Sequence, residues 1–318
     1  MDPTTLAVHV YSIPLRTRFR GIDVRQGVLV RGPAGWGEFS PFLDYGPPVT
    51  ARWWAAAEEA ASVGWPAPLR ETIPVNVTVP AVDPEQAARI VRDSAGCRTA
   101  KVKVAEAGQS LNDDLERVAA VRDVLGPGGR IRVDANGAWD VDSAVRAIRA
   151  LDRFGLEYAE QPCATLAELA ALRRRVDVPL AADESVRTAE DPLRIAGLAA
   201  ADIVVLKVQP LGGVRRALVV AEACGLPVVV SSALETSVGI AAGLALAAAL
   251  PELPYACGLA TVQLLAADVC SQPLLPVDGT LSVRRVEPDV LDAVRADSAT
   301  ARRWHERLAA ASVSQREL

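Results

Sequence analysis

The chain has 318 residues, half of them hydrophobic, and carries a net charge of −5 at pH 7. This length suits one large α/β domain, or one such domain with a smaller companion. The acidic balance and the scattered basic residues argue against nucleic acid or an anionic membrane as a partner. The longest apolar run, 238–250, is too short to span a bilayer, and the first residues lack a signal-peptide pattern. We therefore expect a cytoplasmic protein that acts on a small molecule, without an obligate protein partner.

Five cysteines occur at positions 97, 163, 224, 257 and 270, and no two of them form a C-x-x-C pair. An odd number of unpaired cysteines argues against a disulfide framework and against a structural zinc site. We expect buried free thiols.

The first 72 residues differ in pattern from the rest of the chain. Three stretches alternate in the manner of antiparallel strands, at 9–16, 24–32 and 35–40. The amphipathic stretch that follows predicts a helix over 51–63. Residues 1–72 are therefore expected to form an α+β unit of their own.

From residue 73 onward, strand-like and helix-like segments alternate with a repeat of about 25 residues. The predicted strands are 73–80, 99–104, 131–136, 156–162, 179–185, 201–209, 227–233 and 255–260. The predicted helices start at about 83 and then cover 111–125, 141–154, 166–176, 191–199, 214–224 and 238–250. Eight such units predict a closed parallel (β/α)₈ barrel over 73–262 rather than an open doubly wound sheet. Residues 263–318 are rich in loops, with one predicted helix over 288–310, and can fold back onto the N-terminal unit.

Ionisable side chains stand at the ends of consecutive predicted barrel strands. Asp134, Glu160, Asp183 and Lys207 follow one another at intervals of 26, 23 and 24 residues, which match the barrel repeat. They should therefore project from the same mouth of the barrel, where active sites of this fold lie. Converging carboxylates repel one another unless a cation neutralises them, and an all-oxygen set without histidine or cysteine suits Mg²⁺. An ion-pair network in the barrel mouth is the structural alternative, at a high desolvation cost.

The second predicted strand carries Lys101 and Lys103 on one face, because side chains alternate along a strand. Together with Lys207 they flank the carboxylates, so a substrate carboxylate bound to the metal would lie between lysines. The metal would stabilise the charge that develops when the carbon next to that carboxylate loses a proton. Lys103 can remove this proton if its pKa is lowered towards neutrality. Lys101 is the neighbouring cation expected to lower it, with a possible direct contact to the substrate.

These motifs together resemble the enolase superfamily, in the subgroup of the muconate-lactonizing enzymes. The motifs are GWGEFSP at 35–41, KVK at 101–103, DAN at 134–136, EQP at 160–162, DES at 183–185 and LKVQPLGG at 206–213. The resemblance implies an α+β capping domain over a modified (β/α)₇β barrel. It also implies that Asp134, Glu160 and Asp183 bind Mg²⁺, with Mn²⁺ as a substitute, and that Lys103 and Lys207 are the acid/base pair.

Two further segments, 74–82 and 231–243, are similar to the o-succinylbenzoate synthases of that subgroup. This similarity implies the syn dehydration of 2-succinyl-6-hydroxy-2,4-cyclohexadiene-1-carboxylate in menaquinone biosynthesis. Lys103 would take the α-proton and return it to the leaving hydroxide, while Lys207 stays cationic. An N-acylamino acid racemase or dipeptide epimerase with the same two lysines is an alternative, although the segment CGLATVQ at 257–263 lacks the acidic pair of the epimerases. A catalytically inactive barrel that only binds a ligand is the alternative from another class.

Other residues near the strand ends are candidates for substrate contact or support. Arg132 shares the face of Asp134, with a salt bridge to a neighbouring carboxylate as an equal alternative. Asn136 either supports the metal ligands or caps a loop. Gly258 either lets the substrate approach closely or serves tight packing.

Two segments are expected to reach the substrate from other sides. Ser231 and Ser232 follow the seventh strand, and a helix that starts near Ser237 would offer free N–H groups to the succinyl carboxylate. The segment RTRFRGI carries Arg18 and Arg20 beside a glycine hinge, which fits a lid that attracts an acidic substrate. A solvated basic turn is the alternative for this segment.

Overall fold

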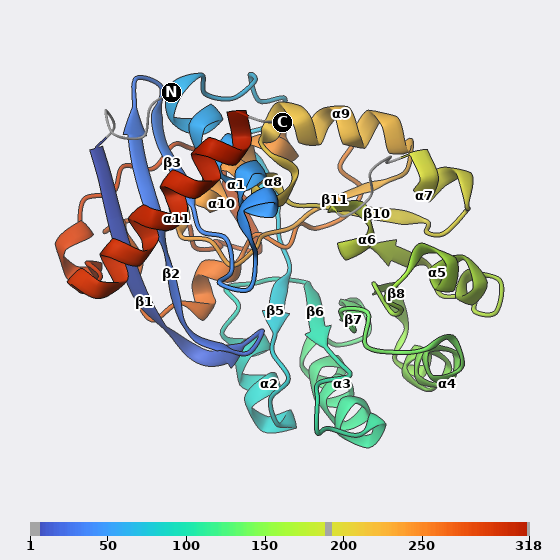
Figure 1. The fold of residues 1–318 in the computed structure, drawn as a ribbon. Helices are drawn as coiled ribbons and strands as arrows, with labels where there is room; N and C mark the ends of the chain where they lie inside the picture. Colours follow the sequence, from blue (N-terminus) through green and yellow to red (C-terminus); the bar gives the residue numbers. More distant parts are fainter. Residues whose placement is uncertain (1–6, 188–192, 317–318) are drawn as a thin grey trace.

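The computed structural model describes residues 7–187 and 193–316. Its N-terminal part is a three-stranded antiparallel sheet with one helix packed against it (Figure 1). The elements are β1 Ala7–Phe19, β2 Ile22–Gly32, β3 Gly35–Phe39 and α1 Pro47–Ser62. The helix begins before residue 51 because two prolines, which suit a first helical turn, open it. A Cβ atom at Gly37 would lie 2.1 Å from the carbonyl oxygen of Ala57, so the close packing of β3 on α1 requires glycine there.

Seven parallel strands form the second sheet, in the order β11-β10-β9-β8-β7-β6-β5. They are β5 Val77–Val79, β6 Thr99–Lys103, β7 Arg130–Asp134, β8 Leu156–Glu160, β9 Leu180–Ala182, β10 Ile203–Leu206 and β11 Val228–Val230. The sheet closes through residues 257 and 258, which form the bridges Val75–Cys257 and Ser231–Gly258. The eighth predicted strand thus pairs with each neighbour at a single position. The result is a modified (β/α)₇β barrel with a separate capping domain.

Helices follow the barrel strands, and Figure 1 shows α2 to α5 along the outer side of β5 to β8. The helices are α2 Pro84–Arg92, α3 Leu111–Leu125, α4 Val141–Leu151, α5 Leu166–Arg173, α6 Glu184–Arg187, α7 Leu193–Gly197, α8 Val208–Leu211, α9 Val214–Cys224 and α10 Ser237–Ala249. Capping boxes open α3 at Ser110 and α5 at Thr165. The predicted α4 ends three residues later than the observed one, because its last turn, 152–154, is a 3₁₀ turn. Residues 191 and 192 of the helix predicted over 191–199 lie outside the described residues.

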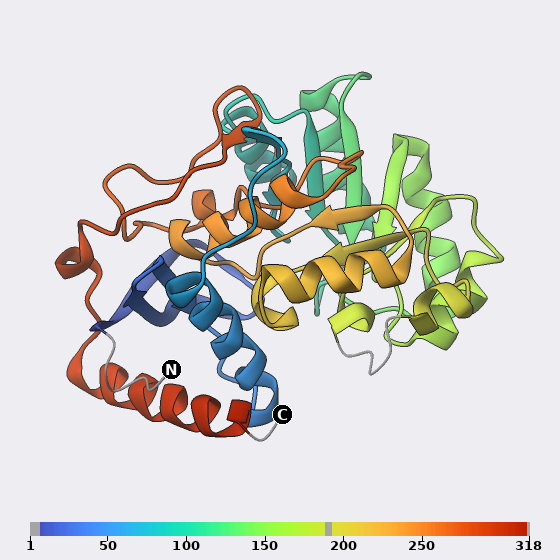
Figure 2. The ribbon, with the colours of Figure 1, turned by 90° about the horizontal axis from the view of Figure 1, so that it is seen from above.

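The C-terminal segment returns to the cap and to the first predicted barrel strand. That strand, 73–80, is split: β4 Thr72–Pro74 pairs with β12 Thr280–Ser282, and only β5 joins the barrel. Two 3₁₀ turns, Thr261–Leu264 and Leu291–Val294, lead to the final helix, α11 Ser298–Arg316. Figure 2 shows α11 lying along α1.

Helix α11 begins ten residues later than the prediction of 288–310. The Asp297 side chain accepts hydrogen bonds from the backbone N–H of Thr300 at 2.8 Å and from its hydroxyl at 3.1 Å, so it caps the helix there. Domain boundaries at residues 72 and 262 stay a prediction.

Helix α10 is apolar on every side, because it lies between the cap and the barrel. All its residues from Ser237 to Ala248 are buried, and β3, β11 and α9 all pack against it. Its small side chains allow this close approach. All five cysteines are buried and free, as predicted. Among the residues that the structure describes, no helix combines the length and the apolar character that crossing a membrane requires.

Candidate active site

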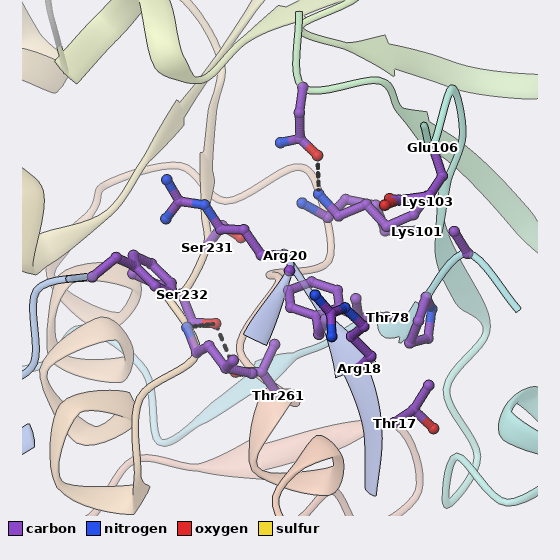
Figure 3. Close-up of a pocket in the computed structure, with 18 of the residues that line it drawn as sticks. Thr17, Arg18, Arg20, Thr78, Lys101, Lys103, Glu106, Ser231, Ser232 and Thr261 are labelled. Atoms are coloured by element: carbon purple, nitrogen blue, oxygen red, sulfur yellow. Dashed lines mark hydrogen bonds between the residues drawn. The ribbon is translucent and has the colours of Figure 1, made fainter. Parts of the chain in front are cut away.

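A cavity of about 290 Å³ lies at the carboxyl ends of the barrel strands, beneath the tip of the β1–β2 hairpin (Figure 3). Its wall combines the cap, the strand ends of the barrel and the segment after β11. The lining residues are Thr17, Arg18, Phe19, Arg20, Gly21 and Phe42 of the cap, Thr78, Pro80, Ala81, Val82, Lys101, Lys103, Glu106, Asn136, Glu184 and Lys207 of the barrel, and Ser231, Ser232, Ala233, Leu234 and Thr261. In Figure 3 the lysines of β6 and the serines after β11 lie on opposite sides, with Arg20 between them.

The structure brings the predicted strand-end residues together at this mouth. Lys103, Asp134 and Glu160 are the last residues of β6, β7 and β8, and the sheet register pairs Lys103 with Asp134 and Asp134 with Glu160. Asp183 directly follows β9, and Lys207 directly follows β10. The lysines line the cavity, whereas the three carboxylates lie behind them with side chains only 1% exposed.

Two lysines of β6 share one carboxylate oxygen of β7. Lys103 Nζ lies 2.6 Å from Oδ2 of Asp134, and Lys101 Nζ lies 3.1 Å from the same atom. Lys101 also contacts Oε1 of Glu160 at 2.8 Å. Burial lowers the pKa of Lys101, but the charges of Glu160 and Asp134 outweigh burial and raise this pKa well above its usual value. The charge of Lys101 was expected to lower the pKa of Lys103, but the carboxylates of Glu160 and Asp134 offset this charge.

The carboxyl groups of Asp134 and Glu160 have opposite pKa shifts. Burial acts to raise both, but Lys103 and Lys101 hold the pKa of Asp134 well below its usual range. For Glu160, burial and the charge of Asp134 raise the pKa to about 7, even though Lys101 lowers it. Oε2 of Glu160 is buried without a hydrogen-bond partner. Of these two carboxyl groups, Glu160 therefore has too little positive charge around it to favour its ionised form.

The donor set fits a hard divalent cation. Three carboxylates from neighbouring strands are the ligand type that such ions prefer, and the orphaned oxygen of Glu160 is an available donor. Within the described part of the chain, no three acidic, cysteine or histidine side chains are arranged to hold a metal as they stand. Lysine ammonium groups occupy oxygens of Asp134 and Asp183 instead, with Lys207 Nζ 2.6 Å from Oδ2 of Asp183. Metal binding there requires the lysines to withdraw from these oxygens.

Asn136 bridges Lys103 and Glu184. Its Oδ1 accepts a hydrogen bond from Lys103 Nζ at 2.6 Å, and its Nδ2 donates to Oε1 of Glu184 at 3.2 Å. Its backbone N–H donates to Oδ1 of Asp134, and its φ of 47° turns the chain out of the barrel. Asn136 therefore orients both Lys103 and Asp134.

Gln161, which the sequence analysis did not single out, holds the neighbouring loop. Its Oε1 accepts from the backbone N–H groups of Asp183 at 2.9 Å and of Ser185 at 3.2 Å. Its φ of 37° is also left-handed. A buried amide directly after a strand-end carboxylate is the signal that points to this role.

The three lysines of the site are the only lysines in the chain, and every other basic residue among the 34 is arginine. Arginine stays protonated in proteins, whereas lysine can give up its proton in a suitable environment. A chain that uses arginine for every other positive charge therefore keeps lysine where a removable proton or a compact ammonium is required. This distribution is visible in the sequence alone.

The wall after β11 differs from the prediction in one respect. Ser231 and Ser232 line the cavity, and the hydroxyl groups of Ser232 and Thr261 are hydrogen bonded at 2.6 Å. The N–H groups at the start of α10 are already bonded: Ser237 N–H donates to Asp268 at 3.1 Å, and the N–H of Gly239 donates to a glutamate of the cap. The prediction that these N–H groups are free for a substrate is wrong, because protein carboxylates occupy them.

Two of the residues predicted to contact or support the substrate, Arg132 and Gly258, do not line the cavity. Arg132 is fully buried inside the barrel, where its Nε donates to Oε2 of Glu157 at 2.5 Å and its Nη1 donates to the carbonyl oxygen of Ala256 at 2.7 Å. This contact is the salt bridge that stood as the alternative. A Cβ atom at Gly258 would lie 2.5 Å from Oγ of Ser231, so this glycine lets the Ser231 segment pack closely.

The hairpin tip is a tight two-residue turn rather than an open loop. Arg20 and Gly21 both have positive φ, of 50° and 74°, between the paired residues Phe19 and Ile22. The guanidinium group of Arg20 lies 3.9 Å from the ring centre of Phe42, and its Nη2 donates to a tyrosine hydroxyl at 2.6 Å. The two aromatic rings at this edge, Phe19 and Phe42, were not predicted from the sequence.

The chain matches the enolase C-terminal domain-like family over residues 83–288 and the enolase N-terminal domain-like family over residues 10–61. It is 71% identical to an o-succinylbenzoate synthase of Thermobifida fusca over 95% of this chain and 94% of that relative. It is 54% identical to the o-succinylbenzoate synthase of Mycolicibacterium smegmatis, over 98% and 96% of the two chains.

Solved structures with the same fold include the L-Ala-D/L-Glu epimerase of Bacillus subtilis (TM-score 0.76, 24% identity, 91% of this chain and 98% of that one). Muconate cycloisomerase of Pseudomonas fluorescens is equally similar (TM-score 0.76, 24% identity, 92% and 98% coverage). The chain belongs to the enolase superfamily, in the branch that contains these o-succinylbenzoate synthases.

Proposed function

We propose that the cavity dehydrates 2-succinyl-6-hydroxy-2,4-cyclohexadiene-1-carboxylate to o-succinylbenzoate, the product that the names of the similar relatives give. The enzyme is a carbon–oxygen lyase of menaquinone biosynthesis that acts on a small carboxylate, and we propose a cytoplasmic location for it. The observation that carries the proposal is the placement of Lys103 and Lys207 in the cavity wall, at the ends of strands β6 and β10, which flank three buried carboxylates. This arrangement suits the removal of a proton next to a substrate carboxylate.

The first step breaks the C–H bond next to the ring carboxylate. Lys103 accepts this proton as a neutral amine, and the two electrons of the bond enter the carboxylate as an enediolate. The amide oxygen of Asn136, which lies 2.6 Å from Lys103 Nζ, keeps the nitrogen at the cavity wall. Lys207 remains an ammonium beside Asp183 and stabilises the added negative charge.

The second step breaks the C–O bond of the ring hydroxyl. Lys103 gives its proton back to this oxygen, so that water leaves from the face that lost the proton and the ring becomes aromatic. Atoms and charge balance, because one proton and one hydroxide leave as water and Lys103 returns to its neutral form. One lysine therefore serves both steps, while Lys207 only supplies charge.

We propose Mg²⁺, with Mn²⁺ as a substitute, as the divalent ion that the family requires, held by Asp134, Glu160 and Asp183. When bound, it would neutralise these carboxylates and stabilise negative charge on the substrate carboxylate. The buried oxygen of Glu160 without a hydrogen-bond partner supports the assignment.

Lysine signals provide a readout of this metal site that does not depend on activity. A sample with ¹³C only at the ε-carbon of lysine is expected to give three side-chain signals, because the chain has three lysines. Addition of Mg²⁺ should shift all three in the nuclear magnetic resonance spectrum, since each ammonium loses a carboxylate partner. Unchanged lysine signals at Mg²⁺ concentrations that saturate the enzyme would contradict the proposed ligand set.

The remaining part of the substrate carries a second carboxylate on its succinyl chain. We propose that the hydroxyl groups of Ser231, Ser232 and Thr261 and the guanidinium of Arg20 receive it on the opposite side of the cavity. In this proposal Arg132 and Gly258 make no direct contact with the substrate. Asn136 acts on Lys103, and Lys101 acts on the carboxylates of Asp134 and Glu160.

The test is an absorbance assay with purified protein and Mg²⁺. Conversion of the cyclohexadiene to the aromatic product is expected at a rate far above that of α-proton exchange into N-acylamino acids in D₂O. Rapid exchange of the amino acid substrates with slow dehydration would instead assign the site to a racemase. Absence of both activities in a folded protein that binds o-succinylbenzoate would favour an inactive barrel.

A further inference from the structure

A carboxylate of the cap occupies the beginning of barrel helix α10. Glu38, on β3, is 3% exposed, and its Oε2 accepts hydrogen bonds from three barrel donors. These donors are the Thr236 N–H at 3.2 Å, the Thr236 hydroxyl at 2.5 Å and the Gly239 N–H at 3.0 Å. The hydroxyls of Tyr11 and Ser40 donate to its other oxygen at 2.7 and 2.8 Å. Glu38 thus accepts hydrogen bonds from both the cap and the start of α10.

A second cap residue holds the other end of the same barrel segment. Arg25, on β2, is 2% exposed, and it donates to the carbonyl oxygens of Leu234 at 2.8 Å and Ala233 at 3.2 Å. Leu234 has a φ of 66°, a left-handed conformation that is strained for a leucine and persists only where surrounding groups fix it. The cap therefore determines the path of residues 233–236.

This segment continues directly from the cavity wall, whereas its two anchors are not part of that wall. Residues 231–234 line the cavity, so Ala233 and Leu234 belong to both, and Figure 3 shows Ser231 and Ser232 there. Neither Glu38 nor Arg25 lines the cavity, so neither can contact a substrate in it. An effect of Glu38 on substrate binding would therefore be indirect, and this segment is the part of the wall that its contacts at Thr236 and Gly239 reach. Arg25 has a second route, because its guanidinium lies 4.6 Å from the ring centre of Phe42 in the cavity wall.

We propose that Glu38 is a positioning residue for substrate binding, because it fixes the segment that presents Ser231 and Ser232 to the succinyl carboxylate. The inference rests on the proposed function. Its role is geometric: the oxygens accept hydrogen bonds from donors at the start of α10, and the cap thereby shapes a wall that it does not itself form.

The chain offers a matched control on the neighbouring helix. Glu59 of α1 is also a cap carboxylate at the start of a barrel helix, where it accepts from the N–H groups of Val214 at 2.6 Å and Arg215 at 3.2 Å. The residues at this contact do not line the cavity. Loss of Glu59 should therefore destabilise the cap–barrel contact without moving the substrate-binding wall.

The experiment compares Glu38→Leu, Glu38→Gln and Glu59→Leu by steady-state dehydration kinetics and thermal unfolding. Glu38→Leu is expected to raise KM about tenfold or more and to change kcat less than about threefold. Glu38→Gln should keep KM within about threefold of the unmodified value, because the amide keeps the shape and one acceptor oxygen, and the hydroxyl of Tyr11 can turn to accept from the new NH₂ group. Glu59→Leu should lower the Tm and leave KM unchanged. Equal KM values for Glu38→Leu and Glu59→Leu would overturn the inference.

A binding measurement separates this inference from the proposed function. If Glu38→Leu does not fold, Glu38→Asp replaces it, because the shorter side chain keeps the charge but cannot reach the same donors. The probes are o-succinylbenzoate and 2-butanoylbenzoate, which lacks the chain carboxylate. The variant is expected to lose affinity for the first probe and to keep its affinity for the second. Unchanged affinity for both probes overturns the positioning role alone. Failure of the unmodified protein to bind o-succinylbenzoate contradicts the proposed function.

Discussion

Lys103→Ala and Lys207→Ala are each expected to lower kcat for dehydration about a thousandfold or more, because each removes a group that acts on the reacting atoms. Without Lys103 the site loses the group that takes up the α-proton and returns it to the leaving hydroxide. Without Lys207 the enediolate loses its cation on the β10 side. The measurement is the absorbance change of the cyclohexadiene substrate with each purified variant, together with its Tm.

Arginine substitutions separate the two lysine roles. Lys103→Arg keeps a positive charge but cannot accept a proton, so we expect it to be as inactive as Lys103→Ala. Lys207→Arg keeps the charge that its role requires and should retain more activity than Lys207→Ala. A Lys103→Arg enzyme with near-normal kcat would remove this residue from proton transfer.

Glu160→Gln is expected to abolish Mg²⁺-dependent activity and, at the same time, to stabilise the metal-free protein at pH 8. The carboxylate is fully buried, its Oε2 has no partner, and its pKa is raised to about 7 by burial and by the charge of Asp134. Its ionised form therefore destabilises the fold when no divalent ion is present. The isosteric amide removes that charge and, with it, a metal ligand.

The pH dependence of stability tests the same residue. The pKa of Glu160 is higher in the folded protein than the value of about 4.3 expected for an unfolded chain. The native state thus holds more protons, and the free energy of unfolding of the metal-free protein should fall as the pH rises from about 4 to 7. Glu235, buried beside Glu38 and Arg25, also has a pKa raised to about 7 and contributes in the same window.

Urea unfolding at several pH values, with and without Mg²⁺, measures the contributions of Glu160 and Glu235. Glu160→Gln should show a shallower fall, because one of the buried carboxyl groups with a raised pKa is then absent, and Mg²⁺ should no longer raise its unfolding midpoint. A variant that Mg²⁺ still stabilises as strongly as the unmodified protein would show that Glu160 is not a ligand.

The barrel and its mouth could be predicted from the sequence because both depend on a local repeat. A βα unit of regular length places each strand-end residue at the same edge, so Asp134, Glu160, Asp183 and Lys207 could be grouped without any knowledge of long-range contacts. The use of lysine at only three positions is a further local signal for the same group.

The remaining features depend on contacts between distant parts of the chain. The pairing of β4 with β12 splits a strand that is continuous in pattern. The ion pair of Arg132 with Glu157, and the cap carboxylate Glu38 on α10, join residues 25 and about 200 positions apart. Hydrophobic periodicity carries no information about such partners, so the alternatives for Arg132 and for the start of α10 could not be decided from the sequence.

The most direct test of the central claim is chemical rescue of Lys103→Ala by a small primary amine. If Lys103 is the group that moves the proton, ethylamine added to the Mg²⁺-loaded variant should restore dehydration in proportion to the concentration of its neutral form. Lys207→Ala should gain nothing from the neutral amine. A Lys103→Ala variant that is folded, binds o-succinylbenzoate and yet is restored only in proportion to the ethylammonium cation would contradict proton transfer by Lys103.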